Sequence, residues 1–351
     1  MRAFIEVFGV QPEVTTQAPG GINLLGEHTD YNDGYVLPTT IPQLTRVGMA
    51  RSTDDRFHIY AANLHELVEY TGSESVSSGF ARYIFGCVQV LKALGENVAP
   101  IMMHVRSEVP MGAGLSSSAA LEVAVLRGLR QLFALTFDDV ELARRAQRAE
   151  VEYAGVRCGI MDQMACSLGD AKHMLFLDTR TLERQLLPLP GGDLVVIDSG
   201  VARTLAATGY NQRRAECEAA ARMLGVIALR DVTTLEHIDR LPAPLNQRAR
   251  HVVTENARVL EAARGVDVVH FGALMNASHA SLRDDYEVSV HPLDQLVELL
   301  QTHEHVYGAR LTGAGFGGAC VALTQAGRAQ QVKHDVLRSY ASAGHRGVAL
   351  V

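Results

Sequence analysis

Cysteine is scarce in this sequence, and its few positions follow no recognised pattern. No two of the cysteines are spaced as Cys-x-x-Cys, and the five that occur are Cys87, Cys158, Cys166, Cys217 and Cys320. An odd number without such pairs argues against a disulfide framework and against a cysteine-based zinc site. We therefore expect reduced thiols and a cytoplasmic location.

Long apolar stretches and an excess of positive charge are missing as well. The sequence has no run of eighteen apolar residues, so we expect no membrane span. The opening segment MRAFIEVFGV carries Glu6 inside its short apolar run, so we expect no secretion signal. A net charge of −7 provides no broad basic surface. We expect neither a membrane nor nucleic acid among the partners.

The composition is that of a folded chain with room for two domains. Of its 351 residues, 47% are hydrophobic and 20% are charged, which allows a sizeable core. Strand-like and helix-like segments mix without regular βαβ alternation, which indicates the α+β class. The segment LLPLPGGD at 186–193 contains two prolines and two glycines, which interrupt regular structure. We therefore place the domains at 1–188 and 189–351.

Helical periodicity is the clearest local signal. Apolar residues recur at helical spacing over 118–133, and Asp138 with Glu141 predicts a second helix that ends at Gly155. Further helices are predicted over 211–224, 246–264, 268–283, 292–302 and 326–342. Strands are predicted over 44–50, 57–62, 101–106, 173–177, 194–198 and 319–323. The first two strands flank RSTDD, which we interpret as a hairpin loop.

A dense polar cluster follows an apolar run near the start of the chain. The stretch APGGINLLGEHTDYNDGYVLP, residues 18–38, places Glu27, His28 and Asp30 within four positions. One interpretation is a surface turn, because Asn-Asp-Gly favours a turn. The other is a polyol site, because carboxylates and imidazoles accept from and donate to sugar hydroxyls. This stretch alone leaves both interpretations open.

The stretch VPMGAGLSSSAA, residues 109–120, joins a glycine turn to a predicted helix. Gly112 and Gly114 allow the backbone to turn tightly and to approach a ligand closely. Free N–H groups and the positive dipole end of the helix suit a phosphate. The alternative is a plain helix cap, where serine is common. We favour the phosphate interpretation, in a form other than the Walker loop, because no GK[ST] ends the stretch.

Two further stretches are ambiguous by themselves. In RCGIMDQ, residues 157–163, Asp162 stands among apolar residues and is either the N-cap of a following short helix, which this stretch by itself favours, or a buried functional acid. In LTGAGFGG, residues 311–318, four glycines within six residues predict a tight loop before a strand. Neither stretch alone indicates a chemistry.

Taken together, the four stretches resemble the galactokinases of the GHMP family of small-molecule kinases. The resemblance extends to the family's sugar motif, its phosphate motif, its catalytic segment (CGIMDQ) and its third motif (LTGAGFGG). It implies a ribosomal-S5-like N-terminal domain and a ferredoxin-like C-terminal domain. It also implies transfer of phosphate from ATP to the 1-hydroxyl of galactose, giving galactose 1-phosphate and ADP. We expect a monomer or a weak homo-oligomer.

The resemblance also assigns roles to single residues. The expected galactose ligands are Glu27, His28, Asp30, Gly159 and Tyr210, and the expected base is Asp162. The phosphates of ATP are expected at Gly112, Gly114, Ser116, Ser117 and Ser118. The adenine is expected near Phe80 and Tyr83, for which core packing is an equal alternative. Mg²⁺ is expected on Ser118 and Glu150, and the alternative for Glu150 is a solvated helix face.

One residue departs from the family pattern. The galactokinases have Arg directly after APG, where this chain has Gly21. The resemblance places that Arg near the transferred phosphate and the base, so we expect its loss to slow turnover. Arg203, Arg213 and Arg214 are candidates to replace the charge. The alternatives are a non-catalytic sensor of galactose and ATP, or a kinase for a related sugar such as N-acetylgalactosamine.

Overall fold

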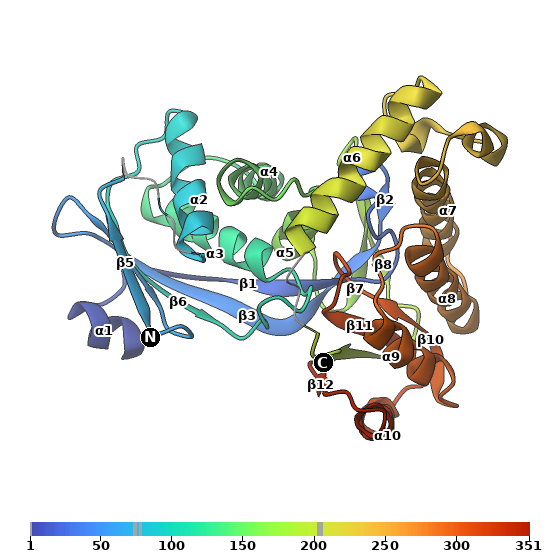
Figure 1. The fold of residues 1–351 in the computed structure, drawn as a ribbon. Coiled ribbons are helices and arrows are strands. Elements are labelled where there is room, and N and C mark those ends of the chain that lie inside the picture. The colour runs from blue at the N-terminus through green and yellow to red at the C-terminus, as the bar shows by residue number, and fades with distance from the viewer. Residues whose placement is uncertain (1, 73–75, 77–78, 202–205) are drawn as a thin grey trace. The chain divides into compact units, whose positions relative to one another are not determined.

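The computed structural model describes residues 2–72, 76, 79–201 and 206–351 (Figure 1). The chain forms two compact units, each assembled from several segments. The first unit comprises Met1–Gly21, Thr40–Pro110 and Ser116–Leu168, and the second comprises Ile22–Thr39, Met111–Leu115 and Gly169–Val351. This division is interleaved, unlike the predicted domains 1–188 and 189–351, and the boundary near 188 stays a prediction.

The first unit is built on a five-stranded sheet. The strands in spatial order are β1 (Val14–Asn23), β3 (Pro38–Arg51), β6 (Ile101–Ser107), β4 (Phe57–Ala61) and β5 (Glu66–Tyr70). One face carries the helices α2 (Ala81–Ala93), α3 (Ser117–Leu132), α4 (Asp139–Ala149) and α5 (Met161–Leu168) (Figure 1). A short helix, α1 (Arg2–Phe8), packs Phe4 and Phe8 against Ala50 and Met102 of the sheet.

The predicted hairpin through RSTDD is wrong. Strand β6 lies between β3 and β4, pairing antiparallel with β3 and parallel with β4. The physical reason lies in burial: residues 101–105 of β6 are all buried, so this strand takes a central place in the sheet. Strand β4 instead makes its hairpin with β5, from Phe57 opposite Tyr70 to Ala61 opposite Glu66.

The predicted helices are present, and the structure adds α1 and α2, which were not among them. Asp138 caps α4, since its Oδ1 accepts a hydrogen bond of 2.8 Å from the Glu141 amide. The helix continues as a π-helical turn, η2 (Glu150–Ala154), and ends at Gly155 with φ +76°. Helix α2 was not predicted. It contains Gly86, which disfavours a helix by itself. A Cβ at Gly86 would lie 3.0 Å from the Ala149 carbonyl oxygen, so the glycine allows α2 to pack closely against the end of α4.

The second unit contains two smaller sheets and most of the remaining helices. One sheet has the order β10 (Val306–Leu311), β11 (Ala319–Thr324), β9 (Asp193–Asp198) and β12 (Val348–Ala349), and the other has β2 (Tyr35–Val36), β7 (His173–Asp178) and β8 (Arg184–Pro188). The helices are α6 (Ala206–Leu224), α7 (Leu245–Ala263), α8 (Val268–Asp284), α9 (His291–Gln301) and α10 (Ala329–Ser342), with 3-10 turns at η1 (Asp30–Asn32), η3 (Leu229–Asp231) and η4 (Leu235–Arg240). All pairings in the four-stranded sheet are antiparallel.

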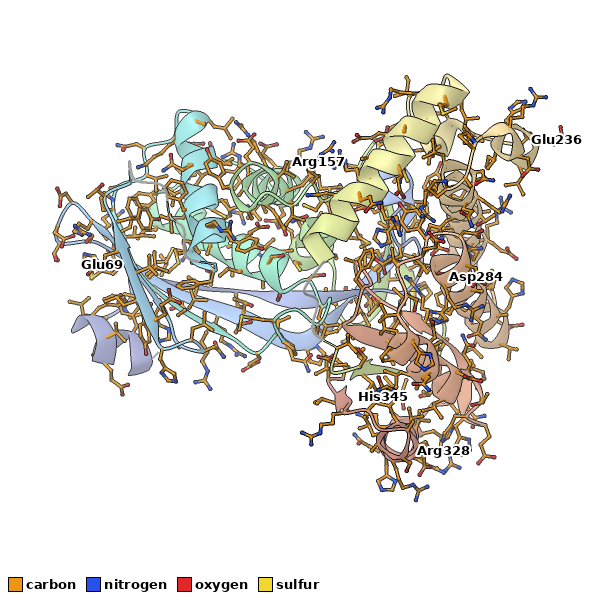
Figure 2. The ribbon with its side chains drawn as sticks, in the orientation of Figure 1. Glu69, Arg157, Glu236, Asp284, Arg328 and His345 are labelled. Atoms are coloured by element: carbon orange, nitrogen blue, oxygen red, sulfur yellow. The ribbon has the colours of Figure 1, made fainter. Side chains whose placement is uncertain are left out.

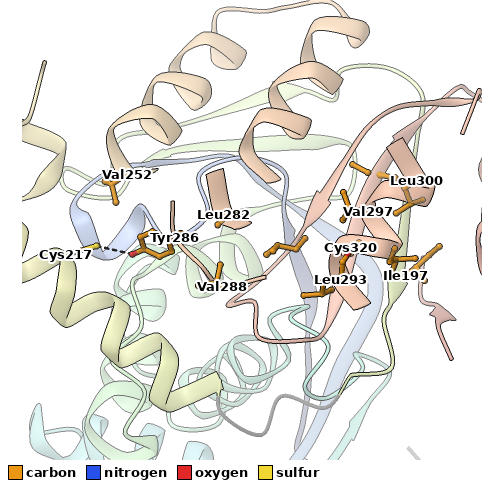
Figure 3. Close-up of a cluster of buried hydrophobic side chains, with 14 of the residues drawn as sticks. Ile197, Cys217, Val252, Leu282, Tyr286, Val288, Leu293, Val297, Leu300 and Cys320 are labelled. Carbon is orange, nitrogen blue, oxygen red and sulfur yellow. Dashed lines mark hydrogen bonds between the residues drawn. The ribbon is translucent and has the colours of Figure 1, made fainter. Parts of the chain in front are cut away.

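The core of the second unit joins its sheet to its helices. Apolar side chains from β9, β11 and α9 meet in one cluster, including Ile197, Leu293 and Val297 (Figure 3). Tyr286 extends this cluster and is fully buried. The mixture of helices with largely antiparallel sheets is the predicted α+β class.

The structure bears on two expectations, the reduced cysteines and the lack of a membrane span. All five cysteines are free thiols, and four of them are buried. Among the residues described, no helix is both long enough and apolar enough to cross a bilayer. The cytoplasmic location and the oligomeric state stay predictions.

Candidate functional site

The polar cluster after Leu25 folds as a turn whose shape is set by glycine. Gly26 has φ +92°, and a Cβ there would lie 2.5 Å from the Tyr35 carbonyl oxygen. The Thr29 hydroxyl donates to the carbonyl oxygens of Gly26 and Tyr35, at 2.8 and 2.7 Å. The turn interpretation is therefore correct for the backbone. The turn and a ligand-binding role are compatible, because Thr29 holds the turn and leaves other side chains of the segment available for a ligand.

Glu27 is held by a buried arginine that the sequence did not reveal. Its Oε2 accepts from Arg310 Nη2 at 2.8 Å and from the Gly313 amide at 3.0 Å. Arg310 is fully buried and also donates to the carbonyl oxygen of Asn23, at 3.3 Å. The only sequence signal was a single Arg within the apolar strand that precedes LTGAGFGG.

Both ring nitrogens of His28 have partners within the second unit. Nε2 lies 3.2 Å from the Ala314 carbonyl oxygen, which can only accept, so Nε2 carries the proton. Nδ1 then accepts from the Tyr31 hydroxyl at 2.8 Å. Burial, and next the charge of His251, hold the pKa of His28 well below its ordinary value. The imidazole is therefore neutral near pH 7.

Aromatic side chains complete this part of the second unit. The Tyr31 hydroxyl bonds the Tyr286 hydroxyl at 2.7 Å, and Tyr286 in turn contacts Cys217 Sγ at 3.1 Å (Figure 3). The ring of Tyr210, from α6, lies 5.1 Å from the Tyr31 ring and 5.4 Å from His28. The structure thus brings Glu27, His28 and Tyr210 into one region.

Asp30 and Gly159, the other predicted sugar ligands, have different surroundings. Asp30 is half-buried in η1, and its Oδ1 accepts from the Tyr31 amide at 3.0 Å. Gly159 belongs to the first unit and is buried. It lies two residues after Arg157, an exposed side chain labelled in Figure 2.

The LTGAGFGG motif connects two loops of the second unit. It supplies the Gly313 amide to Glu27 and the Ala314 carbonyl to His28, while the Ala319 amide after it donates to the Ala113 carbonyl oxygen at 3.1 Å. Every glycine of the motif has positive φ, and so does Phe316. The predicted tight loop is confirmed, and its backbone contacts both the polar turn and the glycine segment at 111–115.

The serine segment is more than a helix cap. Gly112 and Gly114 have φ +76° and +81°. Ser116 occupies the N-cap position of α3 with φ +55°, but its hydroxyl makes no capping bond. The hydroxyl donates instead to Asp162 Oδ1 at 2.9 Å. The cap interpretation is therefore wrong for the Ser116 side chain.

Asp162 lies within the first turn of α5, so the N-cap interpretation that its stretch favoured is wrong. Its contact with Ser116 joins the segment CGIMDQ to the serine segment. Two positions along α3 from Ser116, the Ser118 hydroxyl donates to Glu150 Oε1 at 3.1 Å. The structure therefore brings together Ser116, Ser118, Glu150 and Asp162 in the first unit.

Glu150 belongs to an acidic cluster, which we define as the buried Glu122, Glu150 and Gln163 with the half-buried Asp162. The Gln163 amide nitrogen donates to Glu150 Oε2 at 2.8 Å and to Glu122 Oε2 at 3.3 Å. Burial, then the charge of Asp162, raises the pKa of Glu150 to about 7. Burial, then the charge of Glu150, raises the pKa of Glu122 well above its ordinary value. Glu150 is not a solvated helix residue, which excludes that alternative.

Phe80 and Tyr83 lie at the start of α2, and Tyr83 is near the acidic cluster. Both are half-buried. Burial, then the charges of Glu150 and Glu122, raises the pKa of the Tyr83 hydroxyl to about 12. The phenol is therefore neutral and within electrostatic reach of the acidic cluster.

Gly21 lies in β1 with a backbone conformation outside the left-handed region. A Cβ at this position would lie 3.1 Å from Ser116 Oγ and 3.6 Å from Ala165 Cβ. A side chain here meets the serine that contacts Asp162, so position 21 and Asp162 share a neighbour. The backbone itself poses no obstacle to a larger residue.

Three arginines were candidates to supply the positive charge that is missing at position 21. Arg203 lies outside the described residues. Arg213 donates to the carbonyl oxygens of Tyr286 and Glu287, at 2.6 and 2.9 Å, and is thereby committed to the 286–287 loop. Arg214 pairs with Glu218 at 3.1 Å.

Comparisons with known proteins agree with this arrangement. The galactokinase galactose-binding signature matches residues 2–51, the GHMP kinase N-terminal domain matches 82–170, and the GHMP kinase C-terminal domain matches 259–342. A galactokinase of Roseiflexus sp. (strain RS-1) is 46% identical, over 98% of this chain and 91% of that protein. The chain belongs to the galactokinase family of GHMP kinases. A galactokinase of Thermotoga petrophila is 42% identical over 95% of both chains.

Solved structures give the same result. The chain resembles Lactococcus lactis galactokinase complexed with galactose, with a TM-score of 0.92 and 35% identity over 99% of this chain and 95% of that one. Methanococcus jannaschii mevalonate kinase, at 16% identity and a TM-score of 0.70 over 97% and 98% of the chains, shares the GHMP kinase fold. The predicted fold class is thus confirmed. In the galactokinase family, the galactose-binding signature includes the segment that carries Glu27, His28 and Asp30 here.

Proposed function

We propose that this chain phosphorylates galactose, moving the γ-phosphoryl group of ATP to the 1-hydroxyl of the sugar. The observation that carries this function is the galactose-binding signature at residues 2–51 in a chain 46% identical to a galactokinase over nearly its whole length. ATP is the second substrate, in keeping with the GHMP kinase domains that the chain matches. The products are galactose 1-phosphate and ADP.

We assign galactose to Glu27, His28, Asp30, Gly159 and Tyr210. Buried, oriented polar groups suit this task, because they reject a sugar that would leave them unpaired. Glu27 is oriented by Arg310, and the half-buried Asp30 is assigned the axial hydroxyl. His28 can serve the sugar only by sharing one of its two ring-nitrogen partners, so its contribution should be smaller than that of Asp30.

Asp162 is the proposed base for the anomeric hydroxyl. Its Oδ1 accepts from Ser116, so the carboxylate has a fixed orientation. An Asp carboxylate is a weak base, so it must act mainly through position and charge. The proton leaves the sugar oxygen as that oxygen bonds to phosphorus, and ADP departs with the electrons of the broken P–O bond.

The nucleotide is assigned to the glycine-serine segment. Gly112, Gly114, Ser116, Ser117 and Ser118 would surround the phosphates at the N-terminus of α3, a 16-residue helix. Adenine is assigned to Phe80 and Tyr83 at the start of α2. The neutral phenol of Tyr83 suits stacking on a base.

Ser118 and Glu150 fit the requirements of a Mg²⁺ ion. Their oxygens converge within 3.1 Å, and both are hard donors of the kind that this ion prefers. Glu150 is buried beside Asp162, so a cation there would offset an unfavourable concentration of negative charge. When bound, Mg²⁺ neutralises charge on the phosphate oxygens.

Initial rates of ADP release test the function and the sugar preference together. We expect release that depends on galactose and falls sharply with N-acetylgalactosamine, with arabinose or without sugar. Equal or faster release with another sugar would reassign the substrate. Binding of galactose and ATP without any release would identify a non-catalytic sensor.

A further inference from the structure

The polar turn is anchored from outside by one carboxylate of helix α7. Glu255 is fully buried, and its Oε1 accepts from the Gly26 amide at 2.8 Å, from the Glu27 amide at 3.4 Å and from the Ser278 hydroxyl at 2.7 Å. Its Oε2 accepts from Arg258 Nε at 2.6 Å. Oε1 of this carboxylate therefore accepts three hydrogen bonds, and Oε2 accepts one from a guanidinium group.

Two neighbours on the same helix reach the same segment. His251 Nε2 lies 3.0 Å from the Glu27 carbonyl oxygen, and Asn256 Oδ1 accepts from the Tyr35 amide at 2.9 Å. The approach is close: a Cβ on Gly34 would lie 2.4 Å from Asn256 Oδ1. One face of α7 thus contacts both ends of the turn between Gly26 and Tyr35.

The charge state of Glu255 suits an anchoring role. Burial alone would raise its pKa, but Arg258, His251 and Arg310 outweigh burial and lower the pKa to about 2. The carboxylate is therefore ionised at neutral pH. Hydrogen bonds from backbone amides to a carboxylate are shorter and stronger than those to a neutral acceptor.

We propose that Glu255 is a positioning residue for galactose. By fixing the amides of Gly26 and Glu27 before the sugar arrives, it holds the Glu27 carboxylate and the His28 ring in their binding orientation. Preorganisation of this kind raises affinity because no ordering cost remains to be met on binding. The role rests on the proposed function, since it concerns the same sugar.

Glu255→Gln is the direct test. A glutamine keeps the size but must turn its NH₂ group toward a donor, either toward Arg258 or toward the Gly26 and Glu27 amides. Calorimetry should show galactose binding weakened about 10- to 100-fold, with MgATP binding unchanged. At saturating galactose the turnover number should stay close to that of the parent, so the loss appears in KM.

Asp294→Asn is the matched control. Asp294 belongs to the same unit, and its carboxylate contacts Ser289 at 2.6 Å and His279 at 3.4 Å. The substitution makes the same change from acid to amide, but away from the turn. It should affect thermal stability without affecting galactose affinity. Hydrogen exchange gives an independent readout: amides of residues 24–30 should exchange faster in Glu255→Gln and unchanged in Asp294→Asn.

Should Glu255→Gln fail to fold, Ser278→Ala removes one donor to the same oxygen and should weaken galactose binding in the same direction by a smaller factor. Unchanged galactose affinity and unchanged exchange in either folded variant would overturn the positioning role while leaving the function intact. Failure of the parent chain to bind galactose would overturn the proposed function and this role with it.

Discussion

The two units bury carboxylates in opposite ways. In the second unit, Glu27 pairs with Arg310 and Glu255 pairs with Arg258, so each buried anion has a guanidinium partner. In the first unit, Glu150 has the neutral partners Ser118 and Gln163, and it also shares a hydrogen bond with a second carboxyl group, that of Glu122. Nearby stand two further acids, Glu122 and Asp162. The negative charge of Glu27 and Glu255 is therefore balanced by arginines of the protein. The negative charge of the acidic cluster in the first unit has no such arginine among its described partners.

The difference is visible in proton affinity. The pKa of Glu255 falls to about 2, whereas that of Glu150 rises to about 7. An ionised Glu255 stabilises the fold above pH 4.5, and this contribution is lost as pH falls toward 2. Folded Glu150 retains a proton that the unfolded chain releases near pH 4.5, so its contribution to stability falls as pH rises from 4.5 to 7.

The comparison separates two tasks. A binding loop for a neutral sugar, the role that we propose for the turn of the second unit, can be completed by the protein alone. Here the fully buried Arg310 and the partly buried Arg258 supply the positive charge. A site for a metal ion and a transferring phosphoryl group must leave negative charge to be neutralised by its ligand. Gly21 makes the first unit poorer still in positive charge than the family pattern.

Asp162→Asn removes the proposed chemistry from the acidic cluster and should have the largest effect. The amide can still accept from Ser116 but cannot act as a base. We expect the turnover number to fall by about 10²–10⁴ with galactose affinity retained. Asp139→Asn, at a half-buried acid in the first turn of α4 that pairs with Arg130, is the control. Near-normal turnover in Asp162→Asn would assign the base elsewhere.

Gly21→Arg adds the missing positive charge. We expect turnover to rise by roughly 10–10³, because arginines at a transferring phosphoryl group act mainly on the rate constant. Gly21→Ala, which meets the same Ser116 hydroxyl without adding charge, separates steric from electrostatic effects. If Gly21→Arg melts at the same temperature as the parent and its turnover number is no higher, the missing positive charge does not limit turnover.

Asp30→Ala tests the sugar side of the comparison. Loss of a charged hydrogen-bond partner costs about 1.5–3 kcal/mol, so galactose affinity should fall roughly 10- to 100-fold. ATP affinity should be unchanged in calorimetry. Asp33→Asn, a carboxylate of the same turn that pairs with Arg180, should leave both affinities intact. Equal losses of both ligands in Asp30→Ala would indicate a structural role.

Glu150→Gln should have the smallest effect on the rate. Two measurements, the Mg²⁺ dependence of activity and the unfolding temperature, should reveal its effect. A neutral amide is a weaker ligand for a hard cation, so the Mg²⁺ concentration for half-maximal activity should rise several-fold. The unfolding temperature above pH 7 should rise by a few degrees, because a buried charge is removed. Glu152→Gln, an exposed neighbour paired with Arg148, should change neither. Unchanged metal dependence would contradict the ligand role.

Local signals made much of the fold predictable. The helix from Asp138 to Gly155 and the loop at LTGAGFGG follow from capping, glycine and periodicity within a few residues. The order of β3, β6 and β4 was not predictable in this way, because strand order depends on which strand is most buried. Helix α2 was missed because close packing at Gly86 outweighs its weak local propensity.

The candidate site likewise contains residues that local sequence signals identified and residues that they did not. Polar residues that stand together in the chain, such as Glu27 and His28, could be singled out from the sequence. Their anchors could not, because Arg310 is 283 residues from Glu27 and Glu255 is 229 from Gly26. A lone Arg or Glu in a helix or strand gives no local sign of a partner so far away.

The most direct measurement is ³¹P NMR of the purified chain with galactose and MgATP. We predict the signal of a phosphate on the anomeric oxygen of galactose, growing in equal amount with ADP and requiring both substrates. ATP that stays intact while calorimetry shows both ligands bound would contradict galactose phosphorylation by this chain. So would ADP that accumulates with free phosphate in place of the sugar phosphate.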